Sequence, residues 1–221
     1  MKPPVKPAES AARRAVLETA RAMSASGLSP ARSGNVSTRF SSGLLITPSG
    51  MPYDEIGPAD IVFVAASGAT QSGCRKPSSE WHFHAAAYKA RPDAHAVVHT
   101  HSMHATVLAC AHKPIPAFHY MVAVAGGCDI PLVPYATFGT AALAAHVATG
   151  LAHRDACLMA NHGQIAIGAT LPAALELAHE VETLAEQYLK VLSLGPAHIL
   201  SETDMAAVLQ KFKSYGQRGQ S

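Results

Sequence analysis

Two kinds of hydrophobic pattern follow one another along the chain. Residues 9–27 (ESAARRAVLETARAMSASG) place apolar side chains at helical spacing between Glu9 and Ser10 at the start and Gly27 at the end, which is typical of a helix with both ends marked. Short apolar and β-branched runs bounded by Gly, Pro or Ser predict strands instead. The expected helices are 9–27, 78–90, 102–111, 139–152, 171–194 and 203–215, and the expected strands are 34–40, 43–50, 60–66, 94–101, 129–135, 156–160 and 164–169.

The order of these elements predicts one α/β domain, residues 1–221, in which helices flank a central sheet. Segments 34–40 and 43–50 flank Ser41 and Ser42 like a hairpin, and strands do not alternate strictly with helices. A mixed or largely antiparallel sheet is therefore favoured over a doubly wound parallel one. A chain of 221 residues, 48% of them apolar, can bury one sizeable core. Residues 1–8 and 216–221 are expected to form flexible tails.

Composition favours a small molecule over a macromolecule as the partner. The formal charge is only +2 and the Lys and Arg residues are scattered, so neither nucleic acid nor an anionic membrane is expected to bind. No apolar run is typical of a signal peptide or long enough to cross a bilayer. Without a C-x-x-C pair, the cysteines are interpreted as reduced thiols of a cytoplasmic protein. They are Cys74, Cys110, Cys128 and Cys157.

Three histidines are candidates for a metal site. His99 and His101 follow two valines in VVHTH, and side chains at i and i+2 of a strand point to the same face. His162, in MANHG, comes directly after another apolar strand and could complete the cluster. Three histidine nitrogens with one position left open are typical of a catalytic zinc site. A lone H-x-H is nevertheless more often structural. The structural interpretation is kept for His82, His84, His95, His104, His112, His119 and His179.

Polar groups at three turns are candidates for holding a phosphate. Ser78 and Ser79 stand at an expected helix start, where free N–H groups favour an anion, although a plain helix cap is the commoner use. Glu80 follows on the first turn as a metal ligand, a general base, or both. SGN at 33–35 and TPSG at 47–50 combine Gly with hydroxyl or amide donors, and each could be a simple turn. Together with the histidines, these loops predict a phosphorylated substrate that a metal polarises at its other end.

Motifs along most of the chain resemble one known family. They are SGNVS, LLITPSG, PSSEW.FH.AAY, AVVHTHS.H, IPAFHYM.A.AGG, IP..PYATFGT, NHG, AHEVE.LA..YL and KFKSYG. Running in this order from the first helix to the C-terminal SYG, they are similar to the class II aldolase and adducin family, and most of all to its fuculose-phosphate-cleaving members. The ordered set is far more specific than any single motif in it.

The resemblance implies a largely antiparallel α/β fold, assembled as a homotetramer with active sites at subunit interfaces. It implies one zinc ion per subunit, held by His99, His101 and His162, with Glu80 as the nearby carboxylate. Residues that match phosphate-holding positions are Gly34, Asn35, Ser49, Gly50, Ser78 and Ser79. Residues that match positions near the aldehyde are Tyr120, across the subunit interface, Phe138, and Tyr215 on the C-terminal tail. Arg32 departs from the family, because its fuculose-type members carry a small hydroxyl residue there.

The reaction that the resemblance implies is reversible cleavage of a ketose 1-phosphate, such as L-fuculose 1-phosphate, to dihydroxyacetone phosphate and an aldehyde such as lactaldehyde. In condensation, Glu80 would take the C3 proton of dihydroxyacetone phosphate and Tyr120 would protonate the aldehyde oxygen. Three alternatives stay open: an aldolase for a 5-deoxy- or 5-methylthio-pentulose 1-phosphate, a pentulose-phosphate 4-epimerase, and an adducin-like scaffold. Glu80 favours the aldolase, since epimerase-type relatives carry Asp there, and the complete histidine set argues against the scaffold.

Overall fold

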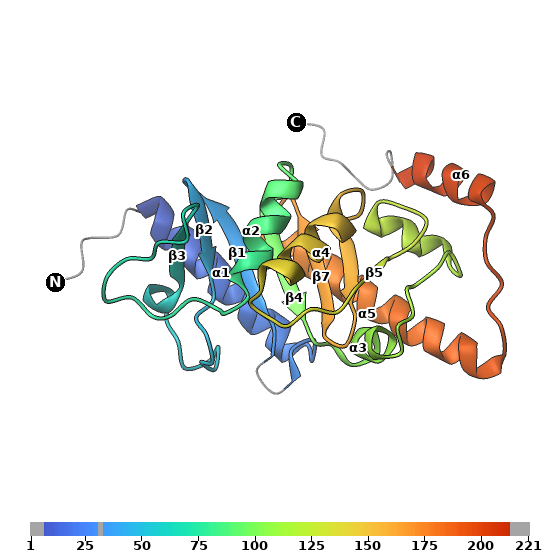
Figure 1. Cartoon of the computed structure of the whole chain (residues 1–221), viewed down its shortest axis with the longest axis horizontal. Coiled ribbons are helices and arrows are strands. Elements are labelled where there is room, and N and C mark those ends of the chain that lie inside the picture. The colour runs from blue at the N-terminus through green and yellow to red at the C-terminus, as the bar shows by residue number, and fades with distance from the viewer. Residues whose placement is uncertain (1–6, 31–32, 213–221) are drawn as a thin grey trace.

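The helices and strands of the chain follow the order that the hydrophobic pattern predicts (Figure 1). The computed structural model describes residues 7–30 and 33–212. The helices are α1 (Pro7–Ala25), α2 (Trp81–Ala90), α3 (Met103–Cys110), α4 (Ala141–Leu151), α5 (Leu171–Leu194) and α6 (Glu202–Phe212). The strands are β1 (Asn35–Phe40), β2 (Gly43–Ile46), β3 (Val62–Ala65), β4 (Ala96–Thr100), β5 (Leu132–Val133), β6 (Ala156–Met159) and β7 (Gly163–Gly168).

The strands form one seven-stranded sheet in the order β3-β2-β1-β4-β7-β6-β5. Every neighbouring pair is antiparallel except β5 and β6, which confirms the largely antiparallel sheet. The central strands β1, β4 and β7 come from distant parts of the sequence, and their pairing places Asn35 opposite His99 and His99 opposite Ile165. The register of these strands therefore determines which polar residues meet near the carboxyl end of β4.

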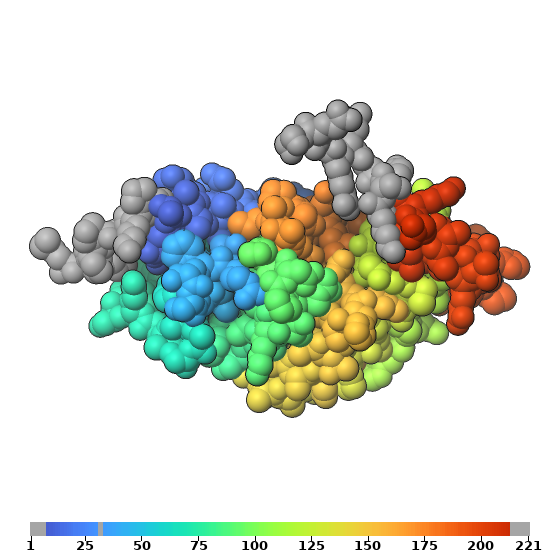
Figure 2. Space-filling model, turned by 90° about the horizontal axis from the view of Figure 1, so that it is seen from above, coloured from blue at the N-terminus to red at the C-terminus, as the bar shows by residue number. Residues whose placement is uncertain are grey.

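Helices cover both faces of this sheet and divide the apolar residues into two cores. One core includes residues of α1, α3 and α5, and the other includes residues of α2 and α4. Helices α2 and α4 lie side by side, as the views in Figures 1 and 2 both show. Alternation along β4 sends Ala96 and Val98 into the first core and Val97 into the second. His99 therefore points to the side of the sheet that α2 and α4 cover.

Local signals explain where several elements begin and end. Helices α4 and α5 start after Thr140 and Thr170, whose hydroxyls accept hydrogen bonds from backbone N–H groups one turn further on. Helix α1 begins at Pro7, two residues before the predicted helix, since proline suits the first turn. Strand β5 is shorter than segment 129–135 because Pro131 and Pro134, which lack a backbone N–H, flank it.

Three further observations complete the comparison with the sequence. The 3-10 helices Pro58–Asp60 and Tyr120–Ala125 were not predicted. No helix among the described residues has the length and apolarity that crossing a membrane requires. Of the expected tails, residues 1–6 and 216–221 lie outside the described part of the chain, whereas Pro7 and Ala8 belong to helix α1.

Candidate metal centre and active site

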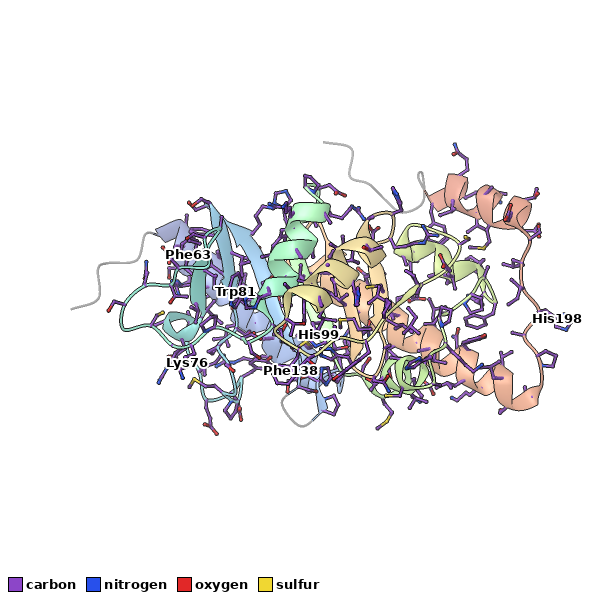
Figure 3. All side chains as sticks on the ribbon, in the orientation of Figure 1. Phe63, Lys76, Trp81, His99, Phe138 and His198 are labelled. Atoms are coloured by element: carbon purple, nitrogen blue, oxygen red, sulfur yellow. The ribbon has the colours of Figure 1, made fainter. Side chains whose placement is uncertain are left out.

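Three histidines and one glutamate converge at the carboxyl end of β4. His99 lies on this strand, His101 follows the strand's last residue, and His162 lies in the turn between β6 and β7. Glu80 precedes the first residue of α2. One ligand atom from each of these four side chains lies within 4.8 Å of all the others. Figure 3 shows His99 near the middle of the molecule. The predicted cluster therefore forms, with two histidines from one strand region and the third from a neighbouring turn.

Two glycines let the backbone segments that carry these residues approach each other. A Cβ on Gly163, which follows His162, would lie 2.4 Å from the carbonyl oxygen of Thr100. A Cβ on Gly34 would lie 2.5 Å from the carbonyl oxygen of His99, and the backbone φ of Gly34 is +93°. Both distances are shorter than a carbon–oxygen contact allows, and this φ favours glycine. Glycine is therefore required at both positions for the strand ends to meet as they do.

Hydrogen bonding directs Nε2 of His99 toward the other members of the cluster. Nδ1 of His99 donates to the backbone oxygen of Gln164 at 2.7 Å, so the neutral ring has an unprotonated Nε2. This nitrogen lies 3.0 Å from Nε2 of His101 and 3.3 Å from Oε2 of Glu80. Burial, together with the neighbouring histidines, lowers the pKa of His101 to about 3. Several electron-pair donors thus share one small volume, an arrangement that suits a divalent cation.

The Glu80 carboxylate lies between this cluster and the start of β1. Its Oε1 is 3.0 Å from Nε2 of His162, and its Oε2 accepts a hydrogen bond of 2.8 Å from the side-chain amide of Asn35. Burial alone would raise the pKa of the carboxyl group, but the positive charge and the hydrogen bonds that the His99 and His162 rings supply when they are protonated outweigh burial and hold the pKa well below its usual range. Glu80 is therefore ionised at neutral pH and able to bind a cation or accept a proton.

Two of the predicted phosphate loops lie directly beside each other. The backbone N–H of Ser78 donates to the oxygen of Thr47 at 3.0 Å, and the N–H of Ser49 donates to the oxygen of Lys76 at 3.0 Å. The hydroxyl of Ser78 accepts from the N–H of Glu80 at 3.3 Å. This contact joins the loops to the first turn of α2 and hence to the carboxylate of the cluster. The exposed members of the predicted set are Ser49, Gly50 and Ser79.

The third predicted loop reaches the same region through Gly34 and Asn35. Tyr53 donates a hydrogen bond of 2.7 Å to the oxygen of Gly34, and burial raises the pKa of this phenol to about 12. The Asn35 amide is held between Glu80 and His84, with its oxygen 2.5 Å from Nε2 of His84. The Asn35 side chain therefore contacts the carboxylate directly, a contact that the sequence did not reveal.

The residues matched to the aldehyde end are more dispersed. Phe138 is 63% exposed, and its neighbour Gly139 lies close to the backbone oxygen of Ser79. Tyr120 is 50% exposed, and its ring contacts that of His119. It is the first residue of a 3-10 helix whose buried residues belong to the same core as residues of α1, α3 and α5. Phe138 thus lies beside one of the predicted phosphate loops, whereas Tyr120 is half exposed to solvent. Tyr215 and Arg32 lie outside the described residues.

Sequence reasoning missed two residues that shape the cluster. Gln164 supplies the backbone oxygen that fixes the His99 tautomer, and no side-chain pattern could have indicated that contact. Glu182 on α5 accepts hydrogen bonds of 2.8 and 2.9 Å from the N–H groups of His104 and Ala105, and it contacts the His104 ring at 2.8 Å. It thereby caps the start of α3, and His104 is not among the four side chains that converge at the end of β4.

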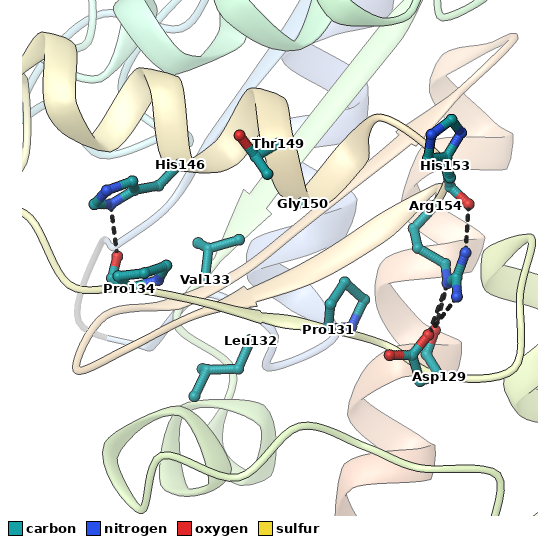
Figure 4. A pocket seen from close by; sticks show the side chains of 10 residues that line it. All are labelled: Asp129, Pro131, Leu132, Val133, Pro134, His146, Thr149, Gly150, His153 and Arg154. Carbon is teal, nitrogen blue, oxygen red and sulfur yellow. Dashed lines mark hydrogen bonds and ion pairs between the residues drawn. The ribbon is translucent and has the colours of Figure 1, made fainter.

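Two hollows in the surface differ in their relation to the cluster. One of about 520 Å³ adjoins His101 and is almost wholly apolar; its other lining residues include Pro30, Met103, Val107 and Cys110. Another of about 430 Å³ lies between β5 and α4 (Figure 4) and contains none of the predicted site residues. Two of its polar side chains bond within the hollow, Arg154 to Asp129 and His146 to the backbone oxygen of Pro134. Of these two hollows, the first is the one that borders the cluster.

Comparison with known proteins identifies the family of the chain and its fold. The family model for the class II aldolase and adducin N-terminal domain matches residues 14–189. The chain is 50% identical over 206 residues to an L-fuculose phosphate aldolase of Escherichia coli O6:H1, covering 93% of this chain and 95% of the relative. It is 51% identical over 210 residues to a 5-methylthioribulose-1-phosphate/5-deoxyribulose-1-phosphate aldolase of Rhodospirillum rubrum, covering 95% of each. A solved L-fuculose 1-phosphate aldolase superposes with a TM-score of 0.88 at 36% identity, over 92% of this chain and 96% of that one.

Proposed function

The chain belongs to the class II aldolase and adducin family, and we propose that it is a metal-dependent aldolase that reversibly cleaves a ketose 1-phosphate. The proposed products are dihydroxyacetone phosphate and an aldehyde, lactaldehyde if the substrate is L-fuculose 1-phosphate. One observation carries the proposal: three imidazole nitrogens and one carboxylate oxygen converge within 4.8 Å beside loops rich in backbone donors. An adducin-like scaffold would have no need of such a buried, acceptor-rich group.

The proposed metal is zinc, one ion per subunit, with His99, His101 and His162 as ligands and Glu80 as the adjacent carboxylate. Three imidazole nitrogens form a donor set that zinc favours, and the His99 hydrogen bond to the Gln164 backbone orients one of them. When bound, the ion would act as a Lewis acid on the substrate's oxygens and stabilise the negative charge left after the carbon–carbon bond breaks.

Glu80 is the proposed acid–base residue. In condensation its carboxylate takes the proton from C3 of dihydroxyacetone phosphate, and in cleavage it returns that proton. Two features support this assignment: the carboxyl group is ionised at neutral pH, and the Asn35 amide holds one of its oxygens. Tyr120 is proposed to donate a proton to the aldehyde oxygen during condensation.

The substrate phosphate is proposed to lie on the three loops beside Glu80. The positions proposed to hold it are Gly34, Asn35, Ser49, Gly50, Ser78 and Ser79. Backbone contacts between the loops at 47–50 and 76–80 keep their donors close together, and the first turn of α2 adds the positive end of a helix dipole. Phe138 and Tyr215 are proposed to line the aldehyde end of the site.

The proposed assembly is a homotetramer in which Tyr120 acts on the site of a neighbouring subunit. Tyr120 is half exposed in the single chain, so its hydroxyl is accessible to a neighbouring subunit. This exposure supports the proposal that it donates a proton at the neighbour's site. We also place the protein in the cytoplasm, as its four cysteines are all free thiols.

A second candidate substrate is a 5-deoxy- or 5-methylthio-pentulose 1-phosphate. The apolar hollow beside His101 favours it, since Met103 and Val107 offer a surface that suits a methyl or methylthio end better than a hydroxylated one. The two candidates share the same metal and phosphate chemistry and differ only in the aldehyde. A pentulose-phosphate 4-epimerase has less support, because Glu80 stands where epimerase-type relatives carry Asp.

The test is a coupled assay of dihydroxyacetone phosphate release from L-fuculose 1-phosphate, 5-methylthioribulose 1-phosphate and a pentulose 5-phosphate, with zinc supplied. Release from either ketose 1-phosphate would support the aldolase and rank the two aldehydes. Epimerisation of the pentulose phosphate without release would replace the aldolase with an epimerase.

The Glu80→Gln variant tests the acid–base assignment. Its kcat is expected to fall by about 100-fold or more, with zinc still bound. Glu186→Gln, on a carboxylate that only pairs with Lys190 on the surface, is the matched control and should turn over like the wild type. Wild-type turnover in Glu80→Gln would refute the assignment.

A further inference from the structure

A chain of hydrogen-bonded side chains leads away from Glu80 into the protein. After the Glu80–Asn35 bond of 2.8 Å, the Asn35 oxygen meets Nε2 of His84 at 2.5 Å. Nδ1 of His84 lies 2.7 Å from the hydroxyl of Ser37, which lies 2.8 Å from the phenol oxygen of Tyr88. His84 and Ser37 are fully buried, and Tyr88 is 5% exposed. The chain therefore runs between β1 and α2 with almost no access to water.

The residues of this chain alternate between the strand and the helix. Asn35 and Ser37 are two positions apart on β1. On the helix side the spacing is four positions: Glu80 directly precedes α2, and His84 and Tyr88 follow within it. Two strand residues span about 6.6 Å and four helical residues about 6 Å, so the two repeats stay nearly in step. Each strand side chain can therefore bond to two helix side chains in turn. The sequence holds this pattern as N-x-S in one segment and E-x3-H-x3-Y in another.

Every hydrogen bond in the chain has a determined direction. The ionised Glu80 accepts only, so Asn35 presents its amide N–H to it and its amide oxygen to His84. The amide oxygen also accepts only, so His84 carries its proton on Nε2 and accepts at Nδ1 from the Ser37 hydroxyl. Ser37, having donated, accepts from Tyr88. The phenol of Tyr88 is thus the first donor and the carboxylate of Glu80 the last acceptor.

These groups lie against apolar neighbours and are not required to fill the core. The surrounding hydrophobic cluster includes Phe83, Ala87 and Val97. Polar side chains buried in such a cluster stabilise the fold little more than apolar side chains would, unless every one of their hydrogen bonds is made. Arg39 closes the far end, with its guanidinium 4.9 Å from the centre of the Tyr88 ring and a hydrogen bond to the Tyr88 backbone oxygen. The one end of the chain that opens toward a reactive group is Glu80.

We propose that His84, Ser37 and Tyr88 are positioning residues for Glu80 and act on it through Asn35. By holding the Asn35 amide in one orientation, they keep an N–H group on Oε2 of Glu80 and leave Oε1 free to turn toward the histidine cluster and the substrate. The proposal rests on the proposed aldolase function, in which Glu80 moves the C3 proton. As a consequence, replacing residues that contact neither substrate nor metal should change the rate of proton transfer more than it changes the affinity for substrate.

Kinetic comparison of variants is the first test. His84→Leu removes the donor to Asn35 and is expected to lower kcat by about 10- to 100-fold, with KM little changed because the phosphate loops stay intact. The rate of exchange of the C3 proton of dihydroxyacetone phosphate in D2O should fall in parallel. His84→Gln, whose amide can donate to Asn35 and accept from Ser37, should restore kcat to within about threefold of the wild type. Tyr88→Phe removes only the most distant link and should have a smaller effect.

A control separates positioning from general destabilisation. Leu151→Ala creates a cavity in the same core without touching the chain of hydrogen bonds, and it should lower the midpoint of thermal unfolding while leaving kcat unchanged. If His84→Leu does not fold, Ser37→Ala removes the donor to Nδ1 of His84 and tests the same chain. A kcat in the folded variant equal to that of the wild type would overturn the proposal, as would an equal loss of kcat in Leu151→Ala.

The second test does not depend on activity. Nitrogen-15 NMR of the wild-type histidines, with and without zinc, should show His84 as a neutral ring protonated at Nε2 in both states. Protonation at Nδ1 would reverse the chain and overturn the proposal. If the wild type cleaves no ketose 1-phosphate while His84 has the expected tautomer, the proposed function fails and the hydrogen-bond chain stands.

Discussion

Replacing Gly163 by alanine adds a single methyl group and should disturb the candidate metal site without changing any of its proposed ligands. An alanine Cβ there would lie 2.4 Å from the Thr100 oxygen and 3.1 Å from Cδ2 of His101. A common carbon–oxygen contact is about 3.3 Å, so the ends of β4 and β7 would have to separate by about 0.9 Å. His101 and His162 lie next to these two atoms on opposite sides of the gap, and the separation therefore moves two proposed ligands apart.

The expected result for Gly163→Ala is a loss of zinc affinity of about 10- to 100-fold, which is typical when the supports of metal ligands are disturbed. Stability should also fall by about 1 to 3 kcal/mol, as for other overpacked sites. Competition against a chromophoric chelator measures the zinc dissociation constant, and urea denaturation of the metal-free protein measures stability.

Gly43→Ala is the matched control for this prediction. Its Cβ would lie 2.1 Å from the oxygen of Val64, an equal or greater clash between two strands of the same sheet. Gly43 pairs with Phe40, at the end of β1 opposite to Asn35. This variant should lose stability and keep its zinc affinity. Unchanged zinc affinity in Gly163→Ala, or the same loss in both variants, would refute the reasoning.

Two further predictions concern acid and the subunit interface. In the metal-free protein, burial of the ring lowers the pKa of His84 from 6.5 to about 3. The unfolded chain binds a proton on this ring near pH 6.5, whereas the folded chain does not. The free energy of unfolding is therefore retained above pH 6.5 and decreases as the pH falls toward 3. Urea midpoints across this range should fall less steeply for His84→Gln, and parallel curves would contradict the assignment. Tyr120→Phe should lower kcat by about 100-fold or more with zinc binding intact. Hybrid assemblies of Tyr120→Phe and Glu80→Gln subunits should regain activity, and hybrids no more active than their parents would exclude a site shared between subunits.

Local patterns in the sequence were enough to locate the secondary structure and most of the candidate metal site. Period-2 and period-3.6 patterns depend on neighbouring residues alone, which is why the predicted strands and α-helices match the observed ones apart from their ends, whereas the two 3-10 helices were missed. His99 lies on β4, His101 directly follows that strand and His162 follows another, so their types and positions already made them candidates for a metal cluster. The family motifs added Glu80, which no local pattern joins to the histidines.

Tertiary structure decided how these groups are held. The tautomer of His99 depends on a backbone oxygen of Gln164, 65 residues away, and the orientation of Glu80 depends on Asn35, 45 residues away. Both contacts result from the register of β4 with β7 and β1, and pairing between distant strands is set by the whole sheet and its two cores rather than by any local pattern. His84 shows the difference most clearly: the sequence left it with the general structural interpretation, and only the packing of α2 on β1 connects it to the carboxylate.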